Sequence, residues 1–129
     1  MAQLIGAFLA SGVLRLLFTD HEHLGTTFPI GAWQQSFVLE IILTYFLMLV
    51  IIFVSQNKDS APFTGIAVGA TVLLEAMFAG PITGASMNPA RSIAPAIVSG
   101  NETGLWIYIL APIIGAMLAS LTWLFMEKK

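Results

Sequence analysis

Residues 80–92 have the sequence Gly80-Pro81-Ile82-Thr83-Gly84-Ala85-Ser86-Met87-Asn88-Pro89-Ala90-Arg91-Ser92, and the other segments of the chain are arranged around them. Its glycines and first proline interrupt an apolar run. Asn88 and Pro89 then form a typical helix start, because asparagine caps a helix N-terminus and proline is tolerated at the first helical position. With stop signals at residues 99–101, the sequence predicts a re-entrant loop followed by an 11-residue half-helix, Asn88–Val98. Such a helix is roughly 16 Å long, about half of the hydrocarbon core of a bilayer.

The overall composition is that of a membrane protein. Of the 129 residues, 57% are hydrophobic and 9% are charged, whereas a typical soluble domain has about 25% charged residues. The net charge of −2 offers no basic surface to nucleic acid. Since the chain contains no cysteine, disulfides and thiolate-bound metals are excluded. We therefore expect membrane lipid around the protein, and we predict no nucleic-acid partner, no metal and no cofactor.

Four apolar runs are predicted to cross the membrane, giving an all-α membrane protein of four transmembrane helices plus the half-helix, in one domain. The runs are residues 1–18, 37–54, 61–79 and 105–126. Four crossings place both termini on the same side as the turn that contains Lys58. Lys58, Lys128 and Lys129 then satisfy the positive-inside rule if that side is cytoplasmic. We expect a multi-pass protein with both termini in the cytoplasm.

Small and aromatic residues in the later runs suggest how these helices pack. Gly65 and Gly69 form a G-x-x-x-G pair, and a second small-residue stripe consists of Ala111, Gly115 and Ala119. Both patterns are typical of close contacts between membrane helices. Trp106, Tyr108 and Trp123 lie near the ends of the last run, where we expect interfacial anchors.

The loop of residues 19–34 contains Asp20-His21-Glu22-His23, which has two possible interpretations. Histidines with flanking carboxylates are possible metal ligands. However, residues two apart share a face only on a strand, and short polar loops often contain histidine. We favour a solvated extracellular loop over a metal site.

Apart from Arg15, which lies one turn from the end of the first run, three charged residues lie within the predicted membrane depth: Glu40, Glu75 and Arg91. Arg91 is in the first turn of the half-helix, where the helix dipole disfavours a cation, so packing alone does not explain it. A functional role for Arg91 is the default interpretation of a charge at this depth. The alternative is that its side chain snorkels to the membrane surface or pairs with a carboxylate. Together with the amide of Asn88, Arg91 suits a pore that passes small neutral solutes and repels cations. Glu40 must find hydrogen-bond donors because it is too deep to reach water.

The run Asn88-Pro89-Ala90-Arg91 resembles the second signature loop of the aquaporin and glycerol-channel (major intrinsic protein) superfamily, whose hallmark is Asn-Pro-Ala followed by arginine. The resemblance implies that Asn88, Pro89 and Ala90 form the pore motif. It also implies a selectivity constriction at Ala76, Ala85 and Arg91, left wide by the two alanines. Glu40 matches a glutamate that accepts hydrogen bonds from the re-entrant loop.

Glu75 departs from the family pattern, which often has a neutral residue there. It could line the pore, pair with Arg91 or face a partner subunit.

The resemblance covers residues 35–126 as one whole repeat and residues 1–18 as the last span of the other repeat. The first two spans and the first half-helix of the family are absent, so the missing channel half or another copy is expected to complete the pore. Stretches such as Leu9-Ala10-Ser11-Gly12 are similar to the nodulin-like branch. That similarity implies glycerol or metalloid acids as solutes besides water.

The resemblance further implies a homotetramer in the plasma membrane. The alternative is a non-conducting membrane subunit or a truncated fragment that only assembles with a partner. An enzyme is disfavoured because the sequence places no nucleophile–base pair at membrane depth.

Overall fold

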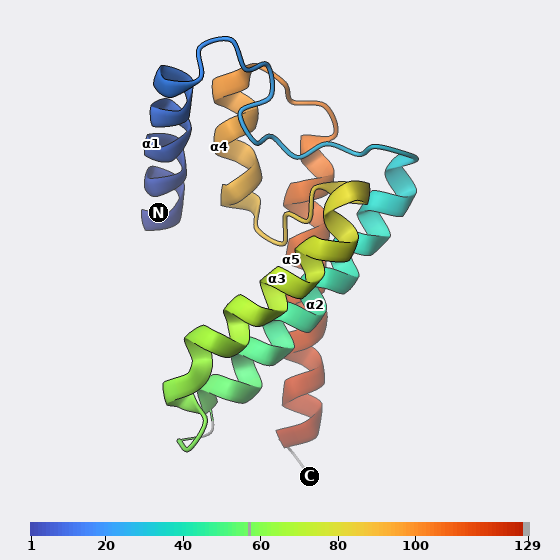
Figure 1. Cartoon of the computed structure of the whole chain (residues 1–129). Helices are drawn as coiled ribbons and strands as arrows, with labels where there is room; N and C mark the ends of the chain where they lie inside the picture. The colour runs from blue at the N-terminus through green and yellow to red at the C-terminus, as the bar shows by residue number, and fades with distance from the viewer. Residues whose placement is uncertain (57, 128–129) are drawn as a thin grey trace.

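A computed structural model describes residues 1–56 and 58–127, and within these ranges the chain forms helices and loops without strands (Figure 1). The elements are α1 (Ala2–Leu17), α2 (Trp33–Gln56), the short 3-10 helix η1 (Ala61–Phe63), α3 (Thr64–Thr83), α4 (Pro89–Ser99) and α5 (Leu105–Glu127). The prediction of an all-α fold with one half-length helix is therefore confirmed. The assignment of the whole chain to one domain stays a prediction.

Three segments are long and apolar enough to cross a membrane: Trp33–Gln56, Ala61–Thr83 and Leu105–Glu127. The first predicted span is the shorter helix α1, with 16 residues. At the helical rise α1 is roughly 24 Å long, which is less than the roughly 30 Å hydrocarbon core. The protein is thus an integral membrane protein in which three of the four predicted spans have full length.

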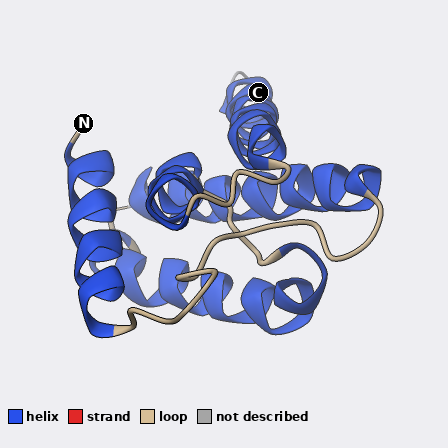
Figure 2. Ribbon diagram, turned by 90° about the horizontal axis from the view of Figure 1, so that it is seen from above, coloured by secondary structure: helices blue, strands red, loops and turns tan. Residues whose placement is uncertain are grey.

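Two groups of helices make up the structure. α2 packs against both α5 and α3, whereas α1 packs against α4 alone among the described helices. Figure 1 shows α1 beside α4, set apart from the lower part of the three long helices. Figure 2 shows the molecule from above, and loops lie across the helix ends that are uppermost in Figure 1. The half-helix α4 therefore lies between a separate short helix and the long-helix group, where it also contacts α5.

The ends of the helices alternate as the sequence predicts. In Figure 1 the end of α2, the start of α3 and the end of α5 lie at the lower edge, and the loop after α1 lies at the upper edge. Lys128 and Lys129, on which the orientation prediction partly rests, lie outside the described residues. Placement of the lower edge in the cytoplasm stays a prediction.

The two small-residue patterns have different outcomes. Ala111 and Ala119 are fully buried, and a Cβ atom added to Gly115 would collide with the carbonyl oxygen of Ile41. This predicted close contact is confirmed and brings α5 against α2. In contrast, the space around Gly65 and Gly69 is open, so the tight contact predicted for that pair is not made within the described chain.

Helix α3 extends beyond the predicted end of its span. It continues through Pro81 to Thr83, so Gly80 and Pro81 do not end it. Gly84 does, because its φ of 82° lies in the left-handed region that glycine adopts without strain. Pro81 has no N–H to donate to the Met77 carbonyl, but the helix continues past it and the Gly84 N–H bonds to the Gly80 carbonyl at 2.9 Å. The re-entrant loop is therefore shorter than predicted.

Helix α4 begins as predicted, with Asn88 as its N-cap and Pro89 as its first residue. It ends at Ser99, one residue beyond the predicted Val98, and Gly100 follows with a left-handed φ of 76°. The local capping signals therefore locate this helix to within one residue.

The loop after α1 is only partly solvated, which corrects the prediction of a solvated loop. Its first part is exposed, but Leu24 and Thr27 are only 4% and 2% exposed. The Nδ1 atom of His21 accepts hydrogen bonds from the backbone N–H groups of His23 and Leu24, which shapes the turn. The second half of the loop contacts α4 through Thr26, whose hydroxyl pairs with Ser99 at 2.9 Å.

Candidate functional site

The loop of residues 84–88 enters the core of the molecule in an irregular conformation. Ala85 and Met87 have positive φ angles of 43° and 53°, although neither is glycine. Each such residue costs on the order of 1–3 kcal/mol and persists only where its surroundings hold it. Both residues are buried, at 7% exposure. The backbone N–H groups of this loop therefore need hydrogen-bond acceptors from other parts of the chain.

Glu40 supplies two of these acceptors. Its Oε1 accepts a hydrogen bond from the Ser86 N–H at 2.9 Å, and its Oε2 accepts one from the Met87 N–H at 2.9 Å. The Thr83 hydroxyl donates a third bond to Oε1 at 2.7 Å. Glu40 is fully buried on α2, so this carboxylate is satisfied by the loop and by the end of α3.

Thr83 and Tyr108 hold the start of the loop. The Thr83 hydroxyl accepts the Ala85 N–H at 2.9 Å, and the Tyr108 hydroxyl donates to the Thr83 carbonyl at 2.8 Å. Tyr108 is fully buried. The prediction that it anchors α5 at the membrane interface is therefore wrong, because its hydroxyl bonds inside the protein.

Asn88 connects the loop to the half-helix. Its Oδ1 accepts a hydrogen bond from the Ala90 N–H at 2.9 Å, which satisfies one of the free donors at the start of α4. Since an amide has one oxygen and one nitrogen, this bond fixes the orientation of the whole group. The Nδ2 atom of Asn88 is consequently turned away from the α4 backbone, and it approaches the Oε1 atom of Gln3 at 3.5 Å.

Arg91 and Ser92 join α4 to the loop that follows α1. The Nη1 atom of Arg91 donates to the Gly25 carbonyl oxygen at 2.9 Å, and its side chain is otherwise exposed. The buried Ser92 hydroxyl bonds to the Thr27 hydroxyl at 2.6 Å and to the Ser86 hydroxyl at 2.5 Å. These bonds fix the base of Arg91 while leaving its charged group accessible.

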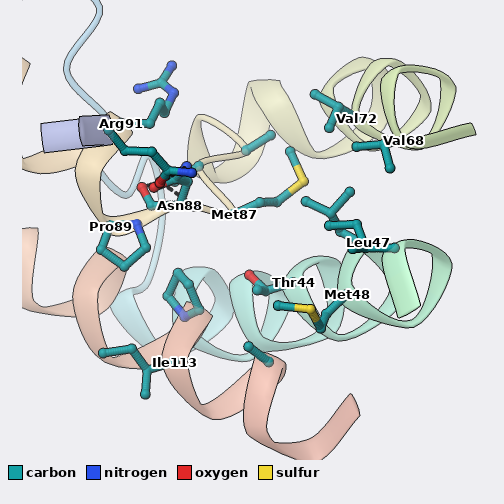
Figure 3. A pocket seen from close by; sticks show the side chains of 16 residues that line it. Thr44, Leu47, Met48, Val68, Val72, Met87, Asn88, Pro89, Arg91 and Ile113 are labelled. Atoms are coloured by element: carbon teal, nitrogen blue, oxygen red, sulfur yellow. Dashed lines mark hydrogen bonds between the residues drawn. The ribbon is translucent and has the colours of Figure 1, made fainter. Parts of the chain in front are cut away.

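Two open cavities meet beside Asn88. The larger, about 640 Å³, lies between α2, α3, α5 and the loop, with Asn88 and Arg91 toward one end and Val68 and Val72 toward the other (Figure 3). The second, about 540 Å³, lies between α1 and α4. The residues that line both are Gln3, Asn88 and Arg91. Polar groups therefore mark the junction of two cavities whose walls are largely apolar.

The residues of the expected constriction are only partly brought together. Ala85 and Arg91 line the larger cavity with Asn88 and Pro89, and the buried Ala90 lines the smaller one. Ala76 lies exposed on α3 and lines neither cavity. Its role in a constriction stays a proposal.

Two of the three roles considered for Glu75, lining the pore and pairing with Arg91, are not supported within this chain, and the third, facing a partner subunit, stays a prediction. Glu75 is 6% exposed on the buried stripe of α3 that also includes Ala79 and Thr83, and it lines neither cavity. Its Oε2 has no hydrogen-bond partner among the described residues, and the Arg91 guanidinium donates to the Gly25 carbonyl oxygen instead. Glu75 is therefore a buried carboxyl group that is incompletely satisfied within this chain.

Comparison with known proteins shows to which family this chain belongs. The profile of the family described as major intrinsic protein matches residues 1–123. The chain belongs to the major intrinsic protein family. Nodulin-26 from Glycine max is 53% identical over 119 residues, and the alignment covers 91% of this chain and 44% of that protein. Aquaporin NIP1-1 from Zea mays is 52% identical over 119 residues, covering 91% and 42% respectively. The chain thus spans less than half the length of these relatives.

Within this major intrinsic protein, sequence reasoning did not identify several residues that hold the site. Thr27 and Gly25 lie on the loop after α1. They contact Ser92 and Arg91 of α4, which are distant in sequence, so no local pattern indicates these contacts. Gln3, which lies where the two cavities meet, is another residue that sequence reasoning did not assign to the site. The available signal was that Gln3 is the first of only three polar residues in α1, the others being Ser11 and Arg15.

Proposed function

We propose that this chain is the C-terminal part of an aquaporin-type channel that passes water and small uncharged solutes such as glycerol or metalloid acids. The observation that carries the proposal is the placement of Asn88 and Arg91 at the junction of two cavities, on a half-length helix. A fixed amide donor and a cation suit solutes that form hydrogen bonds without carrying charge. The names of the relatives, aquaporin and nodulin-26, agree with this class of function.

Each site residue has a proposed role. Asn88 donates to the passing solute, while Pro89 and Ala90 start the half-helix that presents it. Arg91 sets the charge of the constriction, with Ala85 and Ala76 leaving it wide. Glu40 supports the loop by occupying its N–H groups, which keeps them from competing for the carbonyl oxygens.

A complementary segment is needed to close the pore wall. Both cavities are open, and polar groups of irregular backbone are tolerated at membrane depth only where protein or water covers them. We propose that the missing channel half or a second copy of this chain supplies that cover, within a homotetramer in the plasma membrane with cytoplasmic termini. The alternative of a non-conducting subunit is the competing outcome of the experiment.

Stopped-flow light scattering on proteoliposomes tests the proposal. The chain is reconstituted alone and together with the N-terminal part of Glycine max nodulin-26, under water and glycerol gradients. We expect fast volume changes in at least one of the two assemblies, and we expect Asn88→Asp to abolish them. Flux at the level of empty liposomes in both assemblies would overturn the channel function and favour the non-conducting subunit.

A further inference from the structure

The Asn88 amide is oriented by two contacts, of which one lies within α4 and the other reaches across to α1. The first is the bond from the Ala90 N–H to Oδ1 at 2.9 Å. Because this bond assigns the oxygen to the helix, the opposite end of the amide is Nδ2, which has two hydrogens and no acceptor capacity. Any group that faces Nδ2 must therefore be an acceptor.

Gln3 meets this requirement. Its Oε1 lies 3.5 Å from Asn88 Nδ2, so the amide of Gln3 is oriented with its oxygen toward Asn88 and its nitrogen away. At this distance the hydrogen bond is long and weak. Its effect is consequently on the direction of the Asn88 amide more than on the stability of the fold.

The position of Gln3 gives this contact a functional meaning. Gln3, Asn88 and Arg91 are the residues that line both cavities, so Gln3 stands at the same junction from the opposite side, on α1. The Gln3 side chain is exposed toward this space. A solute moving from one cavity to the other must pass all three polar side chains.

We propose that Gln3 is a positioning residue of the solute path, which engages one of the two Asn88 Nδ2 hydrogens and leaves the other directed at the solute. An amide held at both ends presents a single donor in a fixed direction, which favours one hydrogen bond per passing molecule. The Nε2 group of Gln3, turned away from Asn88, offers a further donor at the junction of the two cavities. This inference rests on the proposed channel function and adds a residue on α1 to it.

Two variants separate positioning from a structural effect. Gln3→Met keeps the length of the side chain but removes the acceptor, whereas Gln3→Glu keeps an acceptor and removes the donor. In the conducting assembly we expect Gln3→Met to lower water permeability about twofold, the low end of what one hydrogen bond contributes, and Gln3→Glu to stay closer to wild type. Gln34→Met, on an exposed residue that lines neither cavity, is the control and should leave permeability unchanged.

A double-mutant cycle tests whether Gln3 acts through Asn88. In the Asn88→Ala background, Gln3→Met should cause no further loss of flux, because the group that it orients is gone. Wild-type flux in Gln3→Met, equal losses in Gln3→Met and Gln3→Glu, or additive losses in the double variant would each overturn the inference.

A second measurement is independent of conduction. In the ¹⁵N-labelled chain in detergent micelles, the side-chain amide resonances of Asn88 should shift in Gln3→Met and stay close to wild type in the Gln34→Met control. Unchanged Asn88 resonances in Gln3→Met would overturn the inference whatever the flux. If the Asn88 resonances shift but neither assembly conducts, the contact between Gln3 and Asn88 is supported and the proposed channel function is wrong.

Discussion

Glu40 and Met87 are 47 residues apart in the sequence, and a hydrogen bond of 2.9 Å joins the Met87 N–H to the Glu40 Oε2 atom. Met87 has a φ of 53° and is 7% exposed, so its backbone is both strained and buried. Leaving such an N–H without an acceptor costs about 1–3 kcal/mol. The carboxylate on α2 therefore offsets the cost of an irregular loop that the helices alone would not hold.

Replacing Glu40 by glutamine tests this support. Glu40→Gln keeps the shape but turns one acceptor into an NH₂ group, which then faces the Ser86 N–H, the Met87 N–H or the Thr83 hydroxyl. Since hydrogen bonds to a charged group contribute about 1.5–3 kcal/mol, we expect the free energy of unfolding to fall by about that amount. Denaturant unfolding of the detergent-solubilised protein, followed by circular dichroism, measures the change. An unchanged unfolding midpoint would contradict the role of Glu40.

Replacing Glu75 is predicted to stabilise the protein, whereas replacing Glu40 is predicted to destabilise it. The Glu75 Oε2 atom is buried without a partner among the described residues, whereas both oxygens of Glu40 accept hydrogen bonds. Glu75→Met removes the unsatisfied oxygen and keeps a similar volume, so we expect stability to rise by about 1 kcal/mol or more. Glu40→Met, measured in the same assay, is the matched control and should lower stability. A loss of stability in both variants would show that Glu75 has a stabilising partner.

The sequence predicts those features that depend on neighbouring residues. Asn88, Pro89 and Gly100 locate the half-helix because capping is a local interaction. The end of α3 is different, because Gly80 and Pro81 are helix-breaking residues that the last turn nevertheless accommodates.

Features that depend on distant contacts are less accessible to sequence reasoning. Tyr108 resembles an interfacial anchor by its place near a helix end, and only its proximity to the Thr83 carbonyl turns it inward. The burial of Thr27 likewise depends on Ser92, which is 65 residues away. Long-range hydrogen bonds of this kind leave no periodic pattern in the sequence.

Tyr108→Phe is expected to weaken the start of the loop. The variant keeps the buried ring and removes only the hydroxyl, which leaves the Thr83 carbonyl without that donor. We expect a loss of about 0.5–1.5 kcal/mol, the net contribution of one hydrogen bond. Tyr45→Phe, whose hydroxyl makes a longer 3.2 Å bond to Thr122 nearer the other end of the bundle, is a control that should cost less. Equal losses in the two variants would contradict a specific role for Tyr108.

Gly115→Ala should damage the contact between α2 and α5. The added Cβ would collide with the Ile41 carbonyl oxygen and lie 3.0 Å from the Thr44 Cβ, and overpacking of this kind typically costs about 1–3 kcal/mol. Gly69→Ala is the matched control, because nothing lies within 4 Å of its added Cβ and alanine favours helix. We expect Gly69→Ala to leave the unfolding midpoint unchanged or raised. A destabilised Gly69→Ala would reveal a contact that this chain makes with another copy.

Arg91→Ala should make a conducting assembly leaky to protons. The guanidinium is held by the Gly25 carbonyl and borders both cavities, so it places a fixed positive charge where the two cavities meet. At 4 Å and an effective dielectric constant of 20, two unit charges repel by about 4 kcal/mol, so removing the charge should raise proton leak at least about tenfold. Arg91→Lys keeps the charge and loses the planar donor fork, so it should still exclude protons. Proteoliposomes loaded with a pH-sensitive dye measure the leak after a pH jump. Equal leak in wild type and Arg91→Ala, in vesicles that conduct water, would remove Arg91 from the constriction.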